Sequence, residues 1–562
     1  MRMRERSSCS ARVALAGAVV RRRAAIRFAT VTTVVNKSYR RRRALYAFRQ
    51  HRLLLLWDAR VMHRALWRAV RRSAHRHCHG ADAAAAASRG PVPASTPRRR
   101  PLSTAVSAGD LMFGQPVHET HPHLLRPGHL TPGISAQEYA DRRTALARQL
   151  PHHDAVAIVA AADTVFRSGS VFYEFHQDPD FLYLTGFNEP DALAVIGKDA
   201  SGDDHIFHLY VREKDSSAEQ WDGARSGTQA AKDIFNADDA GDVSRIKHYL
   251  PDIISSASHI FTDITQPDTK ASILQRFLHG SRSKKSTEFA DLIGSRKTSR
   301  LRPLMNDLRA FKSAAELELM RAAGRGSGRA HTDLMRHVWT REKQLDAFFR
   351  YRCVAHGCDT QAFEPVAAGG KNALGIHYIR NDDVLQRGDL VLVDGGAKYG
   401  GYIADISRTW PTNAHFSAPQ RDLYQAVLNV QRSLVSLCRA DANINLDKLH
   451  SMAEGQLAEQ LKQIGFDMSG HAIETLFPHH LGHYIGMDVH DTVGYSRKVT
   501  LQQGHCITIE PGIYVPDDER WPKHFRNIGI RIEDSVAIGD ENPYVLTPEA
   551  VKEMDDIEAL RP

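Results

Sequence analysis

Hydrophobic and polar positions follow two patterns in the first half of the chain. The continuous apolar runs Ala155–Ala161 and Ala192–Ile196 are typical of buried strands. The run His205–Val211 alternates instead, which predicts a strand with only one face on a core. Because helical segments separate these strands, the pattern indicates an α/β arrangement.

Two helices are predicted in the second half. The segment Lys312–Arg336 has helical spacing, although three glycines weaken that prediction: Gly324, Gly326 and Gly328. A second helix begins after Asn445, a favourable N-cap, and ends at Gly465. Its apolar positions fall on one stripe, as expected for a helix on a core: Leu446, Leu449, Ala453, Leu457, Leu461 and Ile464.

Charge is distributed unevenly along the 562 residues, whose formal net charge is +9. Residues 1–100 hold 25 Lys and Arg against three acids, whereas the remainder holds 49 against 62. The overall basic balance therefore belongs to the leader, and we expect no nucleic-acid partner for the acidic body. A leader rich in Arg and Ala is typical of a cleaved mitochondrial presequence, which predicts a location in the matrix. A secretory signal and a basic tail that binds anionic surfaces are the alternatives.

Three further features bound the organisation of the chain. No segment after the leader reaches the 18 or so apolar residues of a membrane helix, so we expect no transmembrane segment. The six cysteines form no CxxC pair, which favours free thiols in a reducing compartment over metal binding. Composition shifts predict a leader and linker over 1–105, a first domain over 106–300 and a second domain over 301–562.

Two aspartates lie in a predicted hairpin over Leu390–Thr409. If Tyr399 and Gly400 form a two-residue turn, Asp394 lies directly opposite Asp405, with Cβ atoms about 5 Å apart. Two buried carboxylates this close repel each other, and a shared proton or a shared cation resolves the repulsion. A solvent-facing hairpin with incidental acids and a slipped register remain alternatives.

A histidine cluster follows in Pro478–Asp491, which contains four histidines: His479, His480, His483 and His490. The spacing from His479 to His483 is that of the HExxH zinc proteases. Because the second position is His480 rather than Glu, and glycines interrupt the segment, that motif is excluded. A single histidine is usually a hydrogen-bonded core residue, but a cluster favours a functional site.

Two glutamates complete the candidate set. Glu510 ends an apolar strand just before Pro-Gly, and Glu533 lies beside Arg531 on the face opposite a row of isoleucines. Each acid alone could be a surface charge or part of an ion pair. Together, two Asp, one His and two Glu favour Mn²⁺ or a similar cation over a cysteine-bound Zn²⁺. So many carboxylates are enough for two ions about 3.5 Å apart.

At this point the sequence resembles a known family. The motifs VDGGAKYGGYIADISRT, HHLGHYIGMDVHD, IEPGIY and GIRIED, in this order, resemble pita-bread metallopeptidases of the aminopeptidase P type. FHQDPDFLYLTGFNEPDA is similar to the creatinase-like N-terminal domain of that family. GQPVHETHPHLLRPGHLTPG resembles the mitochondrial Xaa-Pro aminopeptidase branch, which includes intermediate-cleaving peptidases. The resemblance implies a smaller α/β N-terminal domain over 106–300 and a pita-bread catalytic domain over 301–562.

The resemblance also implies the site. Its metal ligands would be Asp394, Asp405, His483, Glu510 and Glu533, with Asp405 and Glu533 bridging two Mn²⁺ ions, for which Co²⁺ or Zn²⁺ could substitute. The implied catalytic residues are Glu510 as a proton shuttle, His490, His377 and His479 near the substrate, and Arg531 beside the last ligand.

The implied reaction removes the N-terminal residue of peptides or imported proteins, either at Xaa-Pro bonds or by trimming processed mitochondrial precursors. A homodimer or a higher homo-oligomer is the expected assembly. A prolidase acting on Xaa-Pro dipeptides would use the same ligands and is the enzymatic alternative. A non-catalytic pita-bread binding scaffold is the alternative from another class, and it would need no metal.

Overall fold

The structure is a computed structural model of the chain, and it describes residues 112–264, 293 and 297–561. The leader and linker predicted over 1–105 therefore lie outside the described residues. Within the described ranges, none of the helices combines the length and the hydropathy that crossing a bilayer requires. The cysteines of these ranges are free and buried, as predicted: Cys353, Cys358, Cys438 and Cys506.

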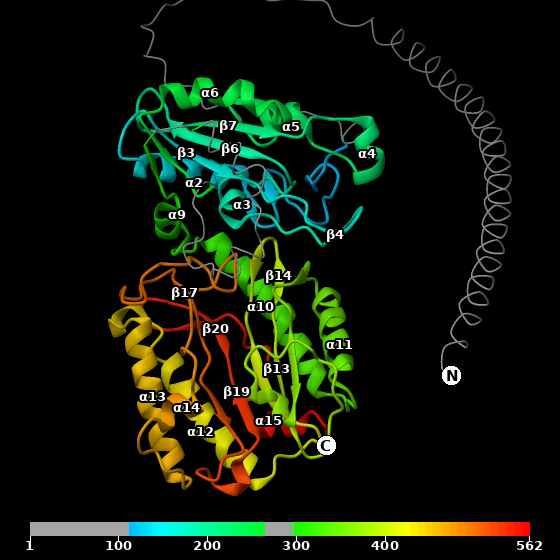
Figure 1. The fold of residues 1–562 in the computed structure, drawn as a ribbon, viewed down its shortest axis with the longest axis vertical. Coiled ribbons are helices and arrows are strands. Elements are labelled where there is room, and N and C mark those ends of the chain that lie inside the picture. Colours follow the sequence, from blue (N-terminus) through cyan, green and yellow to red (C-terminus); the bar gives the residue numbers. More distant parts are fainter. Residues whose placement is uncertain (1–111, 265–292, 294–296, 562) are drawn as a thin grey trace, which may run out of the picture. The chain divides into compact units, whose positions relative to one another are not determined.

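The N-terminal half contains a mixed sheet with helices packed on it (Figure 1). The strands of this half of the chain are β1 (His129–Thr131), β2 (Ile134–Ser135), β3 (Ala155–Ala160), β4 (Phe166–Ser168), β5 (Val171–Phe172), β6 (Leu193–Lys198), β7 (His205–Val211), β8 (Asp239–Asp242), β9 (His259–Phe261) and β10 (Thr298–Ser299). Its helices are α2 (Ala136–Gln149), α3 (Pro179–Thr185), α4 (Ser216–Asp222), α5 (Gly227–Asp233), the 3-10 helix η2 (Val243–Arg245) and α6 (Ile246–Ser256). Six strands pair in the order β10-β9-β3-β6-β7-β8, and the three predicted strands are β3, β6 and β7.

The C-terminal half builds several small antiparallel sheets. Its strands are β11 (Thr360–Gln361), β12 (Val366–Gly369), β13 (Leu390–Asp394), β14 (Ala397–Tyr399), β15 (Tyr402–Ile403), β16 (Ser407–Pro411), β17 (Cys506–Ile509), β18 (Gly512–Val515), β19 (Ile528–Arg531), β20 (Asp534–Ala537) and β21 (Tyr544–Val545). Its helices are α9 (Arg302–Arg309), α10 (Ala314–Met335), α11 (Glu342–Ala355), η3 (Gly370–Leu374), α12 (Ala418–Val435), η4 (Ala440–Ala442), α13 (Leu446–Gln463), α14 (Ala472–Leu476), η5 (Lys523–Phe525) and α15 (Met554–Ala559). Figure 1 shows the strands between α10 and α11 on one side and α12, α13 and α14 on the other.

The hairpin that carries the two aspartates has a different register from the predicted one. Asp394 pairs with Ser407, so the turn residues are Gly400 and Gly401 rather than Tyr399 and Gly400. Both glycines have positive φ (59° and 90°), as a type I′ turn requires, and a tyrosine would be strained there. The prediction that Asp394 faces Asp405 directly is therefore wrong. Asp405 is a diagonal neighbour on the same face, because it lies two residues from the partner of Asp394.

The three glycines of α10 are packing positions rather than weak points. A Cβ atom on Gly324 would overlap the carbonyl oxygen of Leu546, and one on Gly328 would lie 2.8 Å from the amide nitrogen of Ala550. The helix begins with a capping box in which Ser313 and Glu316 bond each other's backbone. The local cost of glycine is thus offset by close contact with the C-terminal segment.

The apolar stripe of α13 is buried as predicted. The Asn445 side chain accepts a hydrogen bond from the amide of Lys448, which is the geometry of an N-cap. The buried positions are Leu446, Leu449, Ala453, Leu457 and Leu461. This stripe contributes to the apolar core that supports the strands of the C-terminal half.

A buried polar group connects α2 of the N-terminal half with α10 and the hairpin. The Arg142 guanidinium donates to the hydroxyl of Tyr402 at 3.2 Å, and that hydroxyl donates to the Glu316 carboxylate at 2.8 Å. The side chains of Arg142 and Glu316 are 6% and 3% exposed and 3.7 Å apart. The two halves therefore share a desolvated ion pair.

Candidate metal centre

The five predicted ligand residues lie where strands end. Asp394 is the last residue of β13, and Asp405 lies between β15 and β16. His483 lies between α14 and β17, Glu510 between β17 and β18, and Glu533 between β19 and β20. Regular strand pairing stops at these positions, so their side chains can turn toward a common point.

Four of these side chains are linked by short distances. Asp405, His483 and Glu533 each offer one ligand atom, and these atoms lie within 4.8 Å of one another. The Nε2 atom of His483 is 3.5 Å from Asp405 Oδ2 and 3.5 Å from Glu510 Oε1. Asp394 is close enough to form a hydrogen bond with Asp405 when one of the two is protonated. The structure thus brings together all five residues that the sequence motifs named.

Three carboxylate oxygens in this cluster are buried and have no hydrogen-bond partner: Asp394 Oδ1, Asp405 Oδ1 and Glu533 Oε1. On two of these acids the second carboxylate oxygen accepts a hydrogen bond. Asp394 Oδ2 accepts from Arg531 at 2.7 Å, and Glu533 Oε2 accepts from Ser407 at 2.8 Å. A buried carboxylate oxygen without a partner is costly, and a divalent cation would supply that partner. The residues present therefore fit a metal site rich in oxygen ligands.

The shifted pKa values of the cluster also support a metal site. Burial raises the pKa of Asp394 to about 6 and that of Glu510 to about 7, and it raises the pKa of Glu533 well above its usual range. Burial lowers the pKa of His483, but its hydrogen bond to Asp405 and the charge of Glu510 prevail and raise it to about 9. The acids outnumber the side-chain cations that could neutralise them. Because a metal must displace these protons, metal affinity should rise with pH.

A chain of hydrogen bonds fixes one side of the cluster. The Arg531 guanidinium, 2% exposed, donates to Asp394 and also to the hydroxyl of Tyr514 at 2.6 Å. That hydroxyl is 2.9 Å from Nε2 of His479, whose Nδ1 is 2.9 Å from the carbonyl oxygen of His480. A carbonyl only accepts, so Nδ1 carries the proton and Nε2 accepts from Tyr514. Burial and then the charge of Arg531 lower the pKa of His479 to about 3, which keeps that ring neutral.

Two residues that hydrogen-bond to Arg531, namely Tyr514 and Ser407, were not predicted from the sequence. Both lie inside motifs used for the resemblance, but neither residue type suggests a role by itself. Ser407 accepts from Nε of Arg531 at 2.8 Å and donates to Glu533 at 2.8 Å, so it connects the two. What distinguishes Tyr514 and Ser407 is their buried contact with Arg531, which a sequence alone does not display.

The two remaining predicted histidines lie at the exposed rim. The ring of His490 stands perpendicular to that of His483, with 4.5 Å between the centroids. Burial and the charge of His483 lower the pKa of His490, and His377 contributes in the same direction. His377 is exposed in the loop after η3 and lies within electrostatic reach of His490. These two rings therefore border the side of the cluster that solvent can reach.

The loop that carries His377 is held by a buried carboxylate. Glu342, 0% exposed, accepts hydrogen bonds from the amides of Gly369 (2.8 Å) and Asp383 (2.9 Å). It also accepts from the Asn372 amide at 2.9 Å and the Tyr378 hydroxyl at 2.7 Å. Four donors on one side chain fix both ends of the loop relative to α11.

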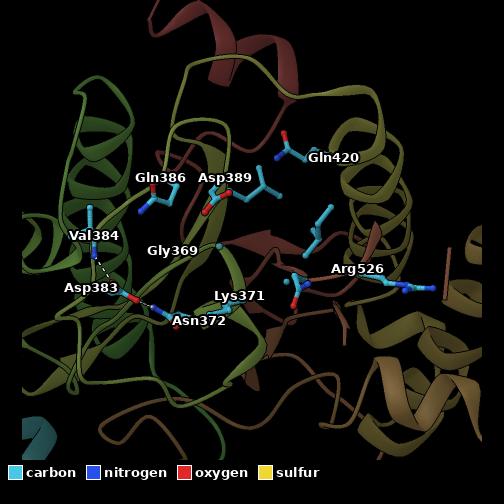
Figure 2. Close-up of a pocket in the computed structure, with 14 residues that line it drawn as sticks. Gly369, Lys371, Asn372, Asp383, Val384, Gln386, Asp389, Gln420 and Arg526 are labelled. Carbon is cyan, nitrogen blue, oxygen red and sulfur yellow. Dashed lines mark hydrogen bonds between the residues drawn. The ribbon is translucent and has the colours of Figure 1, made fainter. Parts of the chain in front are cut away.

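A cavity of about 450 Å³ lies beside this loop, and Figure 2 shows some of the polar side chains around it. Asn372 and Asp383, joined by a 3.2 Å hydrogen bond, line it together with Lys371 and Asp389. The cavity reaches Leu390 at the start of β13, whereas Asp394 ends that strand. None of its lining residues belongs to the candidate metal cluster, so the cavity and the cluster are separate.

Comparisons with known proteins match both halves of the chain. The model of metallopeptidase family M24 matches residues 318–540, and the model of the aminopeptidase P N-terminal domain matches residues 139–261. Intermediate cleaving peptidase 55 of Saccharomyces cerevisiae is 44% identical over 451 residues, which cover 79% of this chain and 88% of that protein. The chain belongs to the aminopeptidase P family. It is a metallo-aminopeptidase of the Xaa-Pro aminopeptidase type.

Other members of the aminopeptidase P family support the same assignment. Xaa-Pro aminopeptidase 3 of Homo sapiens is 38% identical over 468 residues, which cover 80% of this chain and 90% of that protein. The crystal structure of Icp55 from Saccharomyces cerevisiae matches with a TM-score of 0.70 and 42% identity, covering 77% of this chain and 99% of that one. The predicted fold, an N-terminal α/β domain followed by a pita-bread domain, is confirmed. The boundaries at 106, 300 and 301 stay predictions.

Proposed function

We propose that Asp394, Asp405, His483, Glu510 and Glu533 hold two divalent cations, with Asp405 and Glu533 shared between them. Two observations carry this proposal: Asp405, His483 and Glu533 offer ligand atoms close to one another, and Asp394, Asp405 and Glu533 each have a buried carboxylate oxygen without a hydrogen-bond partner. Oxygen ligands with a single nitrogen suit Mn²⁺, for which Co²⁺ or Zn²⁺ could substitute. When bound, such ions polarise the scissile carbonyl and lower the pKa of the attacking water.

The chain's own residues then have separate tasks. Glu510 receives the proton of the attacking water and delivers it to the leaving nitrogen. His490 and His377, at the exposed rim, donate hydrogen bonds to the substrate and to the oxygen on which negative charge develops. Arg531 orients Asp394 and Tyr514, and Tyr514 in turn holds His479 as a neutral ring facing the site.

The proposed substrates are the N-termini of peptides and of imported mitochondrial proteins, from which one residue is removed. The basic leader supports a mitochondrial location. The similarity to intermediate cleaving peptidases of yeast and of Arabidopsis thaliana, the latter described as mitochondrial, supports trimming of processed precursors. The similarity to Xaa-Pro aminopeptidase 3 supports cleavage of Xaa-Pro bonds as a second specificity. A homodimer or a higher homo-oligomer is the proposed assembly.

The experiment combines metal analysis of the purified protein with a peptide panel that varies residues one and two. We expect two equivalents of divalent metal and release of single N-terminal residues from peptides of four or more residues. Activity confined to Xaa-Pro dipeptides would support a prolidase instead. A protein that stays folded and binds no metal would contradict the proposed centre.

A Glu510→Gln variant tests the proton transfer separately. It should stay folded and lose peptide turnover, because glutamine cannot accept the proton. Full peptidase activity in a folded Glu510→Gln variant would refute the role of Glu510.

A further inference from the structure

A second cluster of buried charges packs against the loop that carries the histidine motif. Its members are Arg309 at the end of α9, Lys312 just before α10, and Asp491 in the loop after His490. Their side chains are 6%, 1% and 1% exposed. One oxygen of Asp491 bonds to Arg309, and the other lies 2.9 Å from Nζ of Lys312. Each carboxylate oxygen thus has its own cation, which fixes the side chain in one orientation.

The loop between His483 and Asp491 closes on this cluster. The Asp491 amide donates to the carbonyl oxygen of Tyr484 at 2.9 Å, so the end of the loop returns to its start. Inside it, a Cβ atom on Gly486 would overlap Oδ2 of Asp491 and lie 2.8 Å from Cε of Lys312. The backbone at Gly486 therefore packs directly against the ion cluster.

The cluster also reaches the N-terminal half. Arg309 bonds Oδ1 of Asp180 at 2.6 Å, and Asp180 lies in the first turn of α3. Asp488, in the histidine loop, approaches the same guanidinium at 3.4 Å. One arginine therefore joins α3, the end of α9 and the loop that carries His490.

We propose that Arg309, Lys312 and Asp491 are positioning residues that hold His490 against the metal cluster, with Asp180 steadying Arg309 from the N-terminal half. The proposal deepens the proposed function, since it rests on the role of His490 there. His490 directly precedes Asp491, so a shift of the Asp491 backbone moves the imidazole ring. The ring is exposed and meets His483 at 4.5 Å, so its place depends on the backbone beneath it.

A double-mutant cycle tests the link. Asp491→Asn keeps the shape of the side chain and removes its charge. In the otherwise unchanged protein we expect kcat to fall about 10- to 100-fold with little change in KM, as for supporting residues around metal sites. In the His490→Ala background the same substitution should have no further effect on kcat. An equal loss in both backgrounds would overturn the proposal.

A matched control separates this role from general stabilisation. Asp346 on α11 has a side chain 2% exposed and is also paired with two cations, Lys343 and Arg350. Asp346→Asn should lower the melting temperature and leave kcat unchanged. Should Asp491→Asn fail to fold, Asp180→Asn and Arg309→Lys replace it in the cycle. Of the two, Asp180→Asn should retain more activity, because it leaves the pairing of Arg309 with Asp491 in place.

A readout that needs no peptidase activity keeps the link testable if the proposed function fails. Diethyl pyrocarbonate modifies accessible imidazoles, and mass spectrometry gives the rate at each histidine. We expect Asp491→Asn to raise the rate at His490 severalfold and Asp346→Asn to leave it unchanged. An unchanged rate at His490 in both variants would overturn the positioning role, whether or not the enzyme turns over peptides.

Discussion

Glu533 and Asp534 are neighbours in the chain and are 2% and 1% exposed, yet the pKa values of their carboxyl groups are shifted in opposite directions. Asp534 bonds Arg408 at 2.7 Å and also Lys552, and against the effect of burial these cations hold its pKa well below its usual range. Glu533 has only the Ser407 hydroxyl on one oxygen, and burial raises its pKa. The two cations that pair with Asp534 stabilise its ionised form within the fold, whereas the Glu533 carboxylate accepts no hydrogen bond from a cation in the described part of the chain and keeps one buried oxygen, Oε1, without a partner.

The sharpest way to test this comparison is Glu533→Gln. Activity should fall at least about 10³-fold, equivalent to about 4 kcal/mol of transition-state stabilisation, because one shared ligand is lost. Metal content should fall with it. The metal-free variant should melt at or above the temperature of the metal-free parent, since a buried carboxyl group whose raised pKa disfavours folding at neutral pH has been removed. A folded Glu533→Gln variant with full metal content and activity would contradict the assignment of Glu533.

The neighbouring substitution, Asp534→Asn, should affect stability instead. It leaves the fully buried Arg408 guanidinium without its anion, which typically costs about 3–5 kcal/mol. Denaturant unfolding of the metal-loaded protein measures this difference, and metal content under native conditions should be retained. Equal stability of variant and parent would show that Asp534 and Glu533 are not the contrasting pair described above.

The smallest expected effect is a pH dependence of the metal-free protein. The folded pKa values of Asp394 and Glu510, about 6 and about 7, lie above the unfolded values near 4. Their contribution to stability is therefore present below about pH 4 and is lost as the pH rises through 6 to 7. With a chelator present, the melting temperature of Glu510→Gln should exceed that of the parent by a margin that grows from pH 5 to pH 8. A margin independent of pH would contradict the raised pKa of Glu510.

The candidate ligands could be named from sequence because each lies in a short, ordered motif whose residue types already suit a cation. The register of the hairpin could not, because Tyr399-Gly400 and Gly400-Gly401 both place glycine in the turn. Only the requirement for two positive φ values separates them. Similarly, the glycines of α10 lower helix propensity locally, and the packing partners of Gly324 and Gly328 lie more than 200 residues away.

The contacts that position the candidate site residues could not be predicted from the sequence. Tyr514 and Ser407 both contact Arg531, and Ser407 lies 124 residues from it in the chain. Polar residues with one good hydrogen bond are common in any fold, so their types carry no signal. Asp491 was visible in the histidine motif, but its pairing with Arg309 and Lys312 depends on how the chain returns from residue 312 to residue 491.

The group formed by Arg142, Glu316 and Tyr402 has a consequence for any attempt to divide the protein. Severing the backbone at residue 300 would leave the Arg142 guanidinium paired with Glu138 on one fragment and would deprive the Glu316 carboxylate on the other fragment of that cation. The C-terminal fragment would then carry an acid without its counterion, and complementation by the N-terminal fragment should raise its resistance to proteases.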